Sequence, residues 1–446
     1  MELNTIEYIL EKIRYFNSKL IVNIEKTKLE DIDSWFYDKV LGEITNKNHS
    51  FFQITGIKKS VNQRCFEQPI IIQNEIGYLG IIRKKINNEY HYLMQYKVEP
   101  GNINKIQISP TIQATKSNFT QKHGGRKPAY LDYFIDASKY KIIADQIQSE
   151  QSSRFLGKRN RNIIIELPEN TKIKVLDCHD WMTLKQIKQL MRYDNIVNMD
   201  TRTVLSCIPT SVEYHTEHEI NQVKNSFSDK SLFNSIYYGD KTNHIPYIYQ
   251  YINNFKMFSN VTIEKIPLFK LKNWSMENGE FISKIPFNFK VIFCNINIEG
   301  REVQSWGQPL FEATGMALFG LFTCIDNGIR KFLIKCRPEI GCFDAIEIGP
   351  SVQKEFISNK PEDKVEHLFN EMLNKKQGVL FNTILSEEGG RFYHEQNRNV
   401  IIEIEKNKLE LPKEYFWCDY KTLNMLIQVN NTLNIQLRNL LSVLEF

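Results

Sequence analysis

The sequence predicts an α+β protein built from two tandem copies of one module. Three observations support this: blocks of the first half recur in the same order in the second half, short β-branched segments alternate with turn residues, and amphipathic helical segments flank the strands of the first copy. Because the strand segments are separated by hairpin-type turns, we expect mixed, largely antiparallel sheets.

The repeat is visible residue by residue. Residues 6–35 align without gaps on 245–274 with 11 identities in 30 positions, 68–113 on 308–353 with 11 in 46, and 149–166 on 386–403 with 10 in 18. Unrelated sequences match at roughly one position in fifteen, so composition does not explain three collinear blocks. We therefore expect a first module at 1–206, a connector at 207–244 and a second module at 245–446.

Helical periodicity marks the start of the first module and a later segment of it. Apolar residues at helical spacing predict an amphipathic helix at the start, namely Ile6, Ile9, Leu10, Ile13 and Phe16. A further helix is predicted over 183–192, with Thr183 as its N-cap. The connector between the modules is rich in Ser, Thr, Asp and Gly, which indicates a polar linker.

Strand patterns lie between these helices. Segments rich in β-branched and aromatic residues occupy 70–72, 78–82, 90–96 and 162–166. Asn87-Asn88 predicts a hairpin turn between the second and third of them, and Asp326-Asn327-Gly328 stands at the matching turn of the second copy.

Composition narrows the function classes. The net charge of +5 is spread along the chain without a long Lys/Arg run, so nucleic-acid binding is not indicated. No apolar stretch reaches membrane-spanning length and no secretory leader pattern opens the sequence. The eight cysteines form neither a CxxC nor a Cys/His zinc spacing. We expect reduced thiols, a cytoplasmic location, and no metal or membrane partner.

The first candidate site segment is 97–113. We expect a strand that ends in a Glu-Pro-Gly turn and continues as a strand after it. Turn geometry explains Gly101, which is a glycine in both copies. Glu99 and Gln113 also stand in both copies and are not required by the turn. They serve either a structural hydrogen-bond network or a ligand pocket.

The second candidate segment, 115–127, is rich in hydrogen-bond donors and contains His123. Successive backbone N–H groups around Gly124 and Gly125 can form an anion-binding concavity, beside three basic side chains. The alternative is a solvated basic loop. The matching stretch of the second copy has no His and no Gly, which favours a function in the first copy.

The third candidate segment, 150–162, contains closely spaced arginines. A guanidinium can bond two phosphate oxygens at once, so Arg154 suits a diphosphate. The second copy replaces Lys158-Arg159 by Glu395-Gln396, which removes two positive charges. The alternative is a charged edge strand.

Other motifs are weak. The sequence contains no P-loop, no GxGxxG at a strand–helix junction and no GxSxG elbow. His215 and His218 stand among three glutamates inside the predicted connector, where a solvated acidic segment is the plainer interpretation than a metal site.

At these segments the sequence resembles the NDP-hexose 2,3-dehydratases of deoxysugar biosynthesis. The matching stretches are 68–81, 97–102, 109–118, 123–125, 149–151, 154–162 and 190–202. They extend over nearly the whole chain. One departure is Phe66-Glu67, where the family tends to have Trp-Ser; the second copy keeps Trp306 at that place.

The resemblance implies Nudix-like modules, a homodimer, and elimination of the C2 hydroxyl of a dTDP-4-keto-6-deoxyhexose without metal or redox cofactor. The product is a 3,4-diketo-2,6-dideoxy sugar. The implied proton-transfer candidates are His123, Tyr130 and Glu99. The implied substrate-binding residues are Gln113, Ser117, Asn118, Gly124, Gly125, Arg154, Lys158 and Arg159. On this interpretation the first module holds the working site and the second is a scaffold with at most a remnant pocket.

Two other functions remain open from the residues alone. A Nudix-type nucleotide-sugar hydrolase needs a metal-binding helix, of which only Glu387-Glu388-Gly389-Gly390 resembles the end. A non-catalytic nucleotide-sugar-binding protein needs only the pocket.

Overall fold

The predicted elements of the first module form where the sequence places them. Helix α1 (Ile6–Lys19) begins after Thr5, whose hydroxyl accepts from the Tyr8 backbone N–H. Helix α4 (Leu184–Leu190) begins with the predicted N-cap Thr183, which forms a capping box with Gln186. Asn87 and Asn88 both have positive φ, as a type I′ hairpin turn requires. These local predictions are therefore confirmed.

The structure is a computed structural model that describes residues 5–61, 64–120, 126–210, 216–225, 227–239, 244–301, 303–355 and 360–445. The side chains of Glu219 and Gln222 are also outside this description. Of the predicted residues, His123, Gly124, Gly125 and His215 lie outside the described residues.

A seven-stranded sheet forms the centre of the first half. Its strand path is β10-β11-β6-β7-β12, with β8 beside β7 and β9 beside β6. The bounds are β6 (Gly77–Ile86), β7 (Glu89–Val98), β8 (Ile106–Ser109), β9 (Ile112–Ala114), β10 (Lys141–Ser149), β11 (Arg159–Leu167) and β12 (His179–Thr183). Only β11 and β6 pair in parallel, so the sheet is mixed and largely antiparallel.

The second half contains a seven-stranded sheet with the same strand order. Its path is β22-β24-β18-β19-β25, with β20 beside β19 and β21 beside β18. The bounds are β18 (Ala317–Asp326), β19 (Ile329–Arg337), β20 (Glu347–Pro350), β21 (Val352–Lys354), β22 (Val379–Ser386), β24 (Gln396–Glu403) and β25 (Tyr415–Asp419). The parallel pair is again the corresponding one, β18 with β24.

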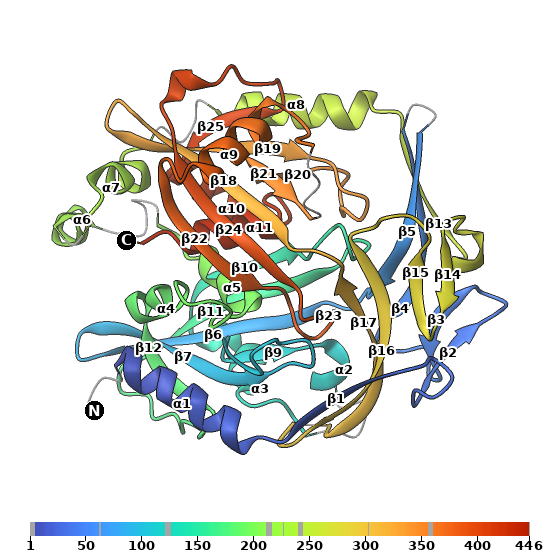
Figure 1. Cartoon of the computed structure of the whole chain (residues 1–446). Helices are drawn as coiled ribbons and strands as arrows, with labels where there is room; N and C mark the ends of the chain where they lie inside the picture. The colour runs from blue at the N-terminus through green and yellow to red at the C-terminus, as the bar shows by residue number, and fades with distance from the viewer. Residues whose placement is uncertain are drawn as a thin grey trace.

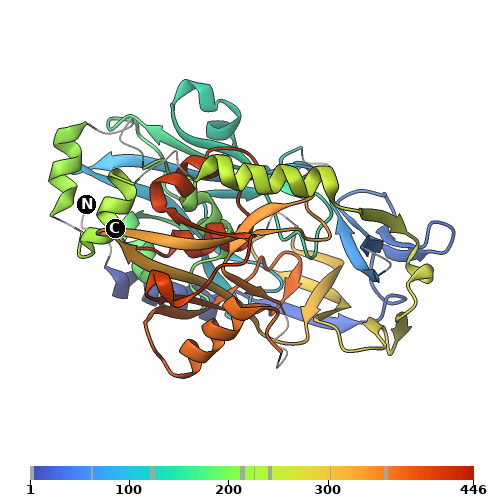
Figure 2. The same cartoon turned by 90° about the horizontal axis from the view of Figure 1, so that it is seen from above.

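Two smaller sheets lie side by side at one end of the molecule (Figures 1 and 2). One contains β2 (Trp35–Asp38), β3 (Glu43–Asn46), β4 (Gln53–Val61), β5 (Arg64–Ile72) and β13 (Val261–Ile266). The other contains β1 (Val22–Thr27), β14 (Trp274–Glu277), β15 (Glu280–Ser283), β16 (Phe289–Ile298), β17 (Ser305–Ala313) and β23 (Phe392–Tyr393).

The two halves exchange strands in these small sheets. Strand β1 of the first half pairs antiparallel with β16 of the second, from Val22 opposite Ile298 to Thr27 opposite Phe293. Strand β13 of the second half pairs in the same way with β4 of the first. Since β1 and β13 occupy matching positions in the sequence repeat, the exchange is reciprocal.

The hydrophobic cores also join the halves. The largest core contains Leu79 and Met94 of the first half together with Leu321 and Leu437 of the second. A separate core between the small sheets contains aromatic residues of both halves, such as Trp35 and Phe289. Burial of apolar surface therefore stabilises the two halves together.

The predicted polar connector is partly helical. It contains α6 (Glu217–Lys224) and α7 (Lys230–Tyr237), which begins at the N-cap Asp229. Leu232, Phe233 and Ile236 of α7 are buried in the large core. The apolar residues of α7 recur at helical spacing, but they lie in a short segment between polar runs. The polar composition of 207–244 therefore led to the prediction of a linker.

The remaining α-helices are short or lie on the outside of the sheets. They are α2 (Lys116–Phe119), α3 (Leu131–Ile135), α5 (Met199–Ser206), α8 (Ile245–Phe258), α9 (Lys364–Asn374), α10 (Tyr420–Ile427) and α11 (Ile435–Ser442). The described residues also include the 3₁₀ helices η1 (Ala137–Lys139), η3 (Leu268–Lys270) and η4 (Lys406–Lys408). Within the described residues, none of the helices combines the length and apolarity needed to cross a bilayer.

Candidate active site

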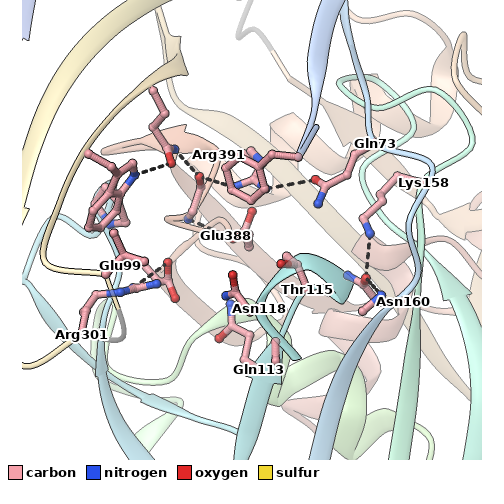
Figure 3. A pocket seen from close by; sticks show the side chains of 18 of the residues that line it. Gln73, Glu99, Gln113, Thr115, Asn118, Lys158, Asn160, Arg301, Glu388 and Arg391 are labelled. Atoms are coloured by element: carbon pink, nitrogen blue, oxygen red, sulfur yellow. Dashed lines mark hydrogen bonds and ion pairs between the residues drawn. The ribbon is translucent and has the colours of Figure 1, made fainter. Parts of the chain in front are cut away.

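A cavity of about 460 Å³ lies between the first seven-stranded sheet and the small sheets, and both halves line it. The first half contributes Gln73, Lys97, Glu99, Gln113, Thr115, Asn118, Glu150, Lys158, Asn160 and Asp200, among others. The second half contributes Arg301, Trp306, Gln308, Glu388 and Arg391, among others. Figure 3 shows Glu388 between Arg391 and Glu99, with Asn118 and Gln113 below. This volume is in the range of small-molecule sites.

The Glu-Pro-Gly turn of the first half holds a loop of the second half against the cavity. The Gly101 N–H donates to the Gly389 carbonyl at 2.6 Å, and the His394 N–H donates to the Gly101 carbonyl at 2.8 Å. A Cβ at Gly101 would lie 1.6 Å from the Phe392 carbonyl oxygen, which no side chain can tolerate. Glycine is therefore required because another backbone passes this close.

Two cations face the cavity without an ion-pair partner among the described residues, Arg391 and Lys158. Arg391 donates to the Gly390 carbonyl at 2.7 Å and to Gln73 Oε1 at 3.2 Å, and its guanidinium lies over the rings of Phe51 and Phe52. Burial lowers the pKa of this guanidinium, which has no hydrogen-bond partner at Nε within the described chain.

Lys158 is 5% exposed, and its Nζ donates to the Glu75 carbonyl at 2.5 Å and to Asn160 Oδ1 at 2.9 Å. Burial lowers its pKa to about 8. A bound anion would favour the charged form of this lysine and would repay part of the desolvation cost of both cations.

Glu99 holds two further cations at the opposite wall. Its carboxylate pairs with Lys97 at 2.8 Å and with Arg301 at 3.3 Å. Burial by itself would raise the pKa of Glu99, but Arg301 and Lys97 together lower it to about 2. Glu99 is thus an anion at any physiological pH.

Three other carboxyl groups of the cavity have raised pKa values, in contrast to Glu99. Burial is the main cause in each case: the pKa of Glu150 rises to about 7, and those of Asp200 and Glu388 rise as well. Mutual repulsion among these groups adds to the effect on Asp200. Carboxyl groups with raised pKa values in a cavity can give and accept protons near neutral pH.

Polar side chains complete the wall of the cavity. Gln113 accepts from Asn198 Nδ2 at 3.3 Å, and Asn118 lies beside it on α2. Ser117 donates to Glu75 at 3.2 Å and lines a neighbouring cavity of about 310 Å³. Of the sequence-predicted residues, Glu99, Gln113, Asn118 and Lys158 come together around the larger cavity.

Three predicted residues lie elsewhere in the described structure. Arg154 pairs with Glu355 and, at 3.3 Å, with Glu395, both in the second half. Arg159 lies 3.7 Å from the ring centroid of Phe343. Tyr130 donates to the Lys174 carbonyl at 2.8 Å and accepts from the Leu176 N–H. None of the three is among the residues that line the larger cavity.

The sequence prediction missed the contribution of the second half. Arg391 is the repeat counterpart of Arg154, and it is Arg391 that reaches the cavity beside Lys158. The Arg-Phe motif is recognisable in both copies of the sequence. The sequence did not show that the Arg-Phe of the second copy lies beside the residues of the first. The lining therefore does not divide into a working half and a scaffold half.

A cavity that presents cations and carboxyl groups of raised pKa is typical of an enzyme site for an anionic small molecule. A sequence model of the family described as NDP-hexose 2,3-dehydratase matches residues 7–208 and 246–444. The chain belongs to this family.

Two curated relatives illustrate the similarity. A dTDP-4-dehydro-6-deoxy-alpha-D-glucopyranose 2,3-dehydratase from Streptomyces violaceoruber is 33% identical over 94% of this chain and 92% of its own length. An enzyme of the same name from Saccharopolyspora spinosa is 35% identical over 93% of this chain and 86% of its own length. The resemblance seen in the motifs is thereby confirmed.

Proposed function

We propose that this enzyme removes water across C2 and C3 of dTDP-4-keto-6-deoxyglucose, the substrate in the names of its relatives. The cavity carries the proposal, because it combines carboxyl groups of raised pKa with two cations that have no ion-pair partner among the described residues. Arg391 and Lys158 would bind the diphosphate, and the guanidinium fork suits two of its oxygens.

The chemistry needs proton transfer and charge stabilisation only. The C4 ketone acidifies the C3 hydrogen, and a base removes it while donors near the C4 oxygen stabilise the enolate. The C2 hydroxyl is β to the ketone and leaves as water. The remaining enol tautomerises to the 3,4-diketo-2,6-dideoxy sugar, so no electron acceptor enters the balance.

His123 is proposed as the base at C3, since a neutral imidazole accepts protons near neutral pH. Glu99 is a weak base with a pKa near 2, so we assign it the role of holding Arg301. Gln113 and Asn118 are proposed to contact sugar hydroxyls, with Gly124 and Gly125 supplying backbone donors. Near-normal turnover of a folded His123→Ala variant would remove His123 from this scheme.

Finer properties rest on the family resemblance alone. We propose that the two halves are duplicated Nudix-like modules, that the chain forms a homodimer, and that it works in the cytoplasm without metal or redox cofactor. Light scattering of the purified protein tests the dimer: a single-chain mass would contradict it.

Incubation of the protein with dTDP-4-keto-6-deoxyglucose, followed by mass spectrometry, tests the reaction. We expect a product lighter by one water. Release of a nucleoside monophosphate on addition of Mg²⁺ would indicate a hydrolase instead. Saturable binding without any change in the sugar would indicate a non-catalytic protein.

A further inference from the structure

We propose that Asp200 is the catalytic acid that protonates the C2 hydroxyl as it leaves, a role that rests on the proposed function. Asp200 stands in the first turn of α5 and lines the cavity, although only 2% of it is exposed. No group in the described part of the chain donates a hydrogen bond to its Oδ1. A buried carboxyl without a donor is far more stable with its proton than without it.

Hydrogen bonding distinguishes Asp200 from the two carboxyl groups near it. Glu150 Oε1 accepts from Asn160 Nδ2 at 2.7 Å, and Glu388 Oε1 accepts from the Gly390 N–H at 2.9 Å. These bonds stabilise the ionised form of each glutamate, and nothing equivalent is described for Asp200. Of the three carboxyl groups, Asp200 is the one held neutral most firmly.

The charges around Asp200 also raise its pKa on balance. Burial has the largest effect on the pKa of Asp200, and Glu150, Glu388 and Glu99 raise it further. Lys97 lowers it, and the N-terminus of α5 also favours an anion. Burial and these acidic neighbours outweigh Lys97, so the proton stays on Asp200 until a substrate group takes it.

The second half offers an internal comparison. Aligning 192–202 with 428–438 places Asn198 on Asn434 and Arg202 on Arg438, so Asp200 corresponds to Gln436. An amide can fill the same space and form hydrogen bonds, but it has no proton to transfer. The start of the helix is therefore shared by both halves. At this helix position an acidic side chain stands only in the first half, where Asp200 lines the cavity.

The proton balance closes with one acid and one base. The base takes the C3 hydrogen, the electron pair forms the enolate, the C2–O bond breaks, and Asp200 gives its proton to the departing hydroxyl, which leaves as water. The C3 enol hydroxyl then returns a proton to the Asp200 carboxylate, and the protonated base delivers its proton to C2. Both groups return to their starting state.

The Asp200→Asn variant tests this role because it keeps the shape of the side chain. We expect dehydration to fall by roughly 10²- to 10⁴-fold, the usual contribution of a general acid. In D₂O the variant should still exchange the C3 hydrogen of the unreacted substrate, measured by NMR, because the base is intact. Its affinity for dTDP, measured by calorimetry, should match that of the wild type.

A substrate analogue with fluorine at C2 gives a second measurement. Fluoride leaves with much less need for protonation, so Asp200→Asn should eliminate fluoride at a rate within a few-fold of the wild type. Gln436→Asn is the matched control and should dehydrate the normal substrate at the wild-type rate. Should Asp200→Asn fail to fold, Asp200→Ser is measured in the same way.

Three outcomes would overturn the proposal: dehydration by the variant at near wild-type rate, loss of C3 exchange together with dehydration, or fluoride elimination slowed as much as dehydration. Loss of dTDP affinity in both variants would likewise assign Asp200 to binding rather than to catalysis. Failure of the wild-type protein to dehydrate its substrate is a separate result, which concerns the proposed function itself.

Discussion

Arg391 and Arg154 occupy matching positions in the two halves, but among the described residues only Arg154 forms ion pairs. Arg391 is held by a carbonyl and by Gln73, near Lys158. Arg154 is held by the carboxylates of Glu355 and Glu395. Burial lowers the pKa of Arg391, whereas Glu355 and Glu395 raise that of Arg154 against the same effect of burial.

Two residue exchanges account for most of this difference. Lys158 corresponds to Glu395 in the repeat, and continuing the neighbouring block without a gap places Thr115 on Glu355. Arg154, from the first half, is neutralised by carboxyl groups of the second half. Arg391, from the second half, has no ion pair among the described residues, which leaves its charge available for the anionic ligand that we propose.

The largest effect on ligand affinity is expected when Arg391 is given the acidic neighbour that Arg154 has. Lys158→Glu removes one cation and places a carboxylate near Arg391, as Glu395 stands near Arg154. We expect the Kd for dTDP to rise roughly 100-fold or more, since truncating a buried charge pair commonly costs about 2–5 kcal/mol. Titration calorimetry measures this. Lys158→Gln, which removes the charge only, should show a smaller loss; equal affinity in all three proteins would contradict the comparison.

A smaller effect is expected from pH. The pKa of Lys158 is lowered to about 8, so its ammonium is charged below that pH and neutral above it. A bound diphosphate favours the charged form, so affinity for dTDP should fall above pH 8 by up to about tenfold per pH unit. Lys158→Arg keeps its charge and should abolish the decline. A wild-type affinity that rises above pH 8 would refute this account.

The smallest effect on the reaction is expected when the negative charge is removed at Glu395, the counterpart of Lys158 in the second half. Glu395→Gln leaves Arg154 paired with Glu355, and the pKa of Glu395 is already raised to about 8 by burial. We expect kcat/KM to change by less than about twofold, because no charge of the working cavity is altered. Steady-state kinetics decide this, and a loss as large as that of Lys158→Glu would mean that both arginines serve the reaction.

The sequence predicted local features of the fold, but it did not predict which residues of the two halves come together in the site. Thr183, Asn87 and Asn88 act through neighbours in the chain, so their patterns predicted the helix start and the turn correctly. Glu99, Gln113, Asn118 and Lys158 line the cavity as residue type suggested. Arg391 was missed because its loop is held at the cavity by Gly101, which bonds Gly389 and His394 from nearly three hundred residues away in the chain.

Buried acidity was equally invisible in the sequence. Nothing adjacent to Asp200 distinguishes it from an ordinary helix-start aspartate, and its properties come from Glu150 and Glu388, which approach from two different sheets. Repeat comparison offers the one accessible signal, the replacement of Asp200 by Gln436.

The exchanged strands set an order for events during synthesis. Strand β4 ends at Val61, and its partner β13 begins at Val261, so 261 − 61 = 200 residues must be translated before this pair can close. At about 5–20 residues per second this is a delay of roughly 10–40 s. During that time β4 lacks its partner on one side, a condition that invites association with other nascent chains. A chaperone that shields this edge on the ribosome would therefore raise the yield of folded enzyme more than one acting after release.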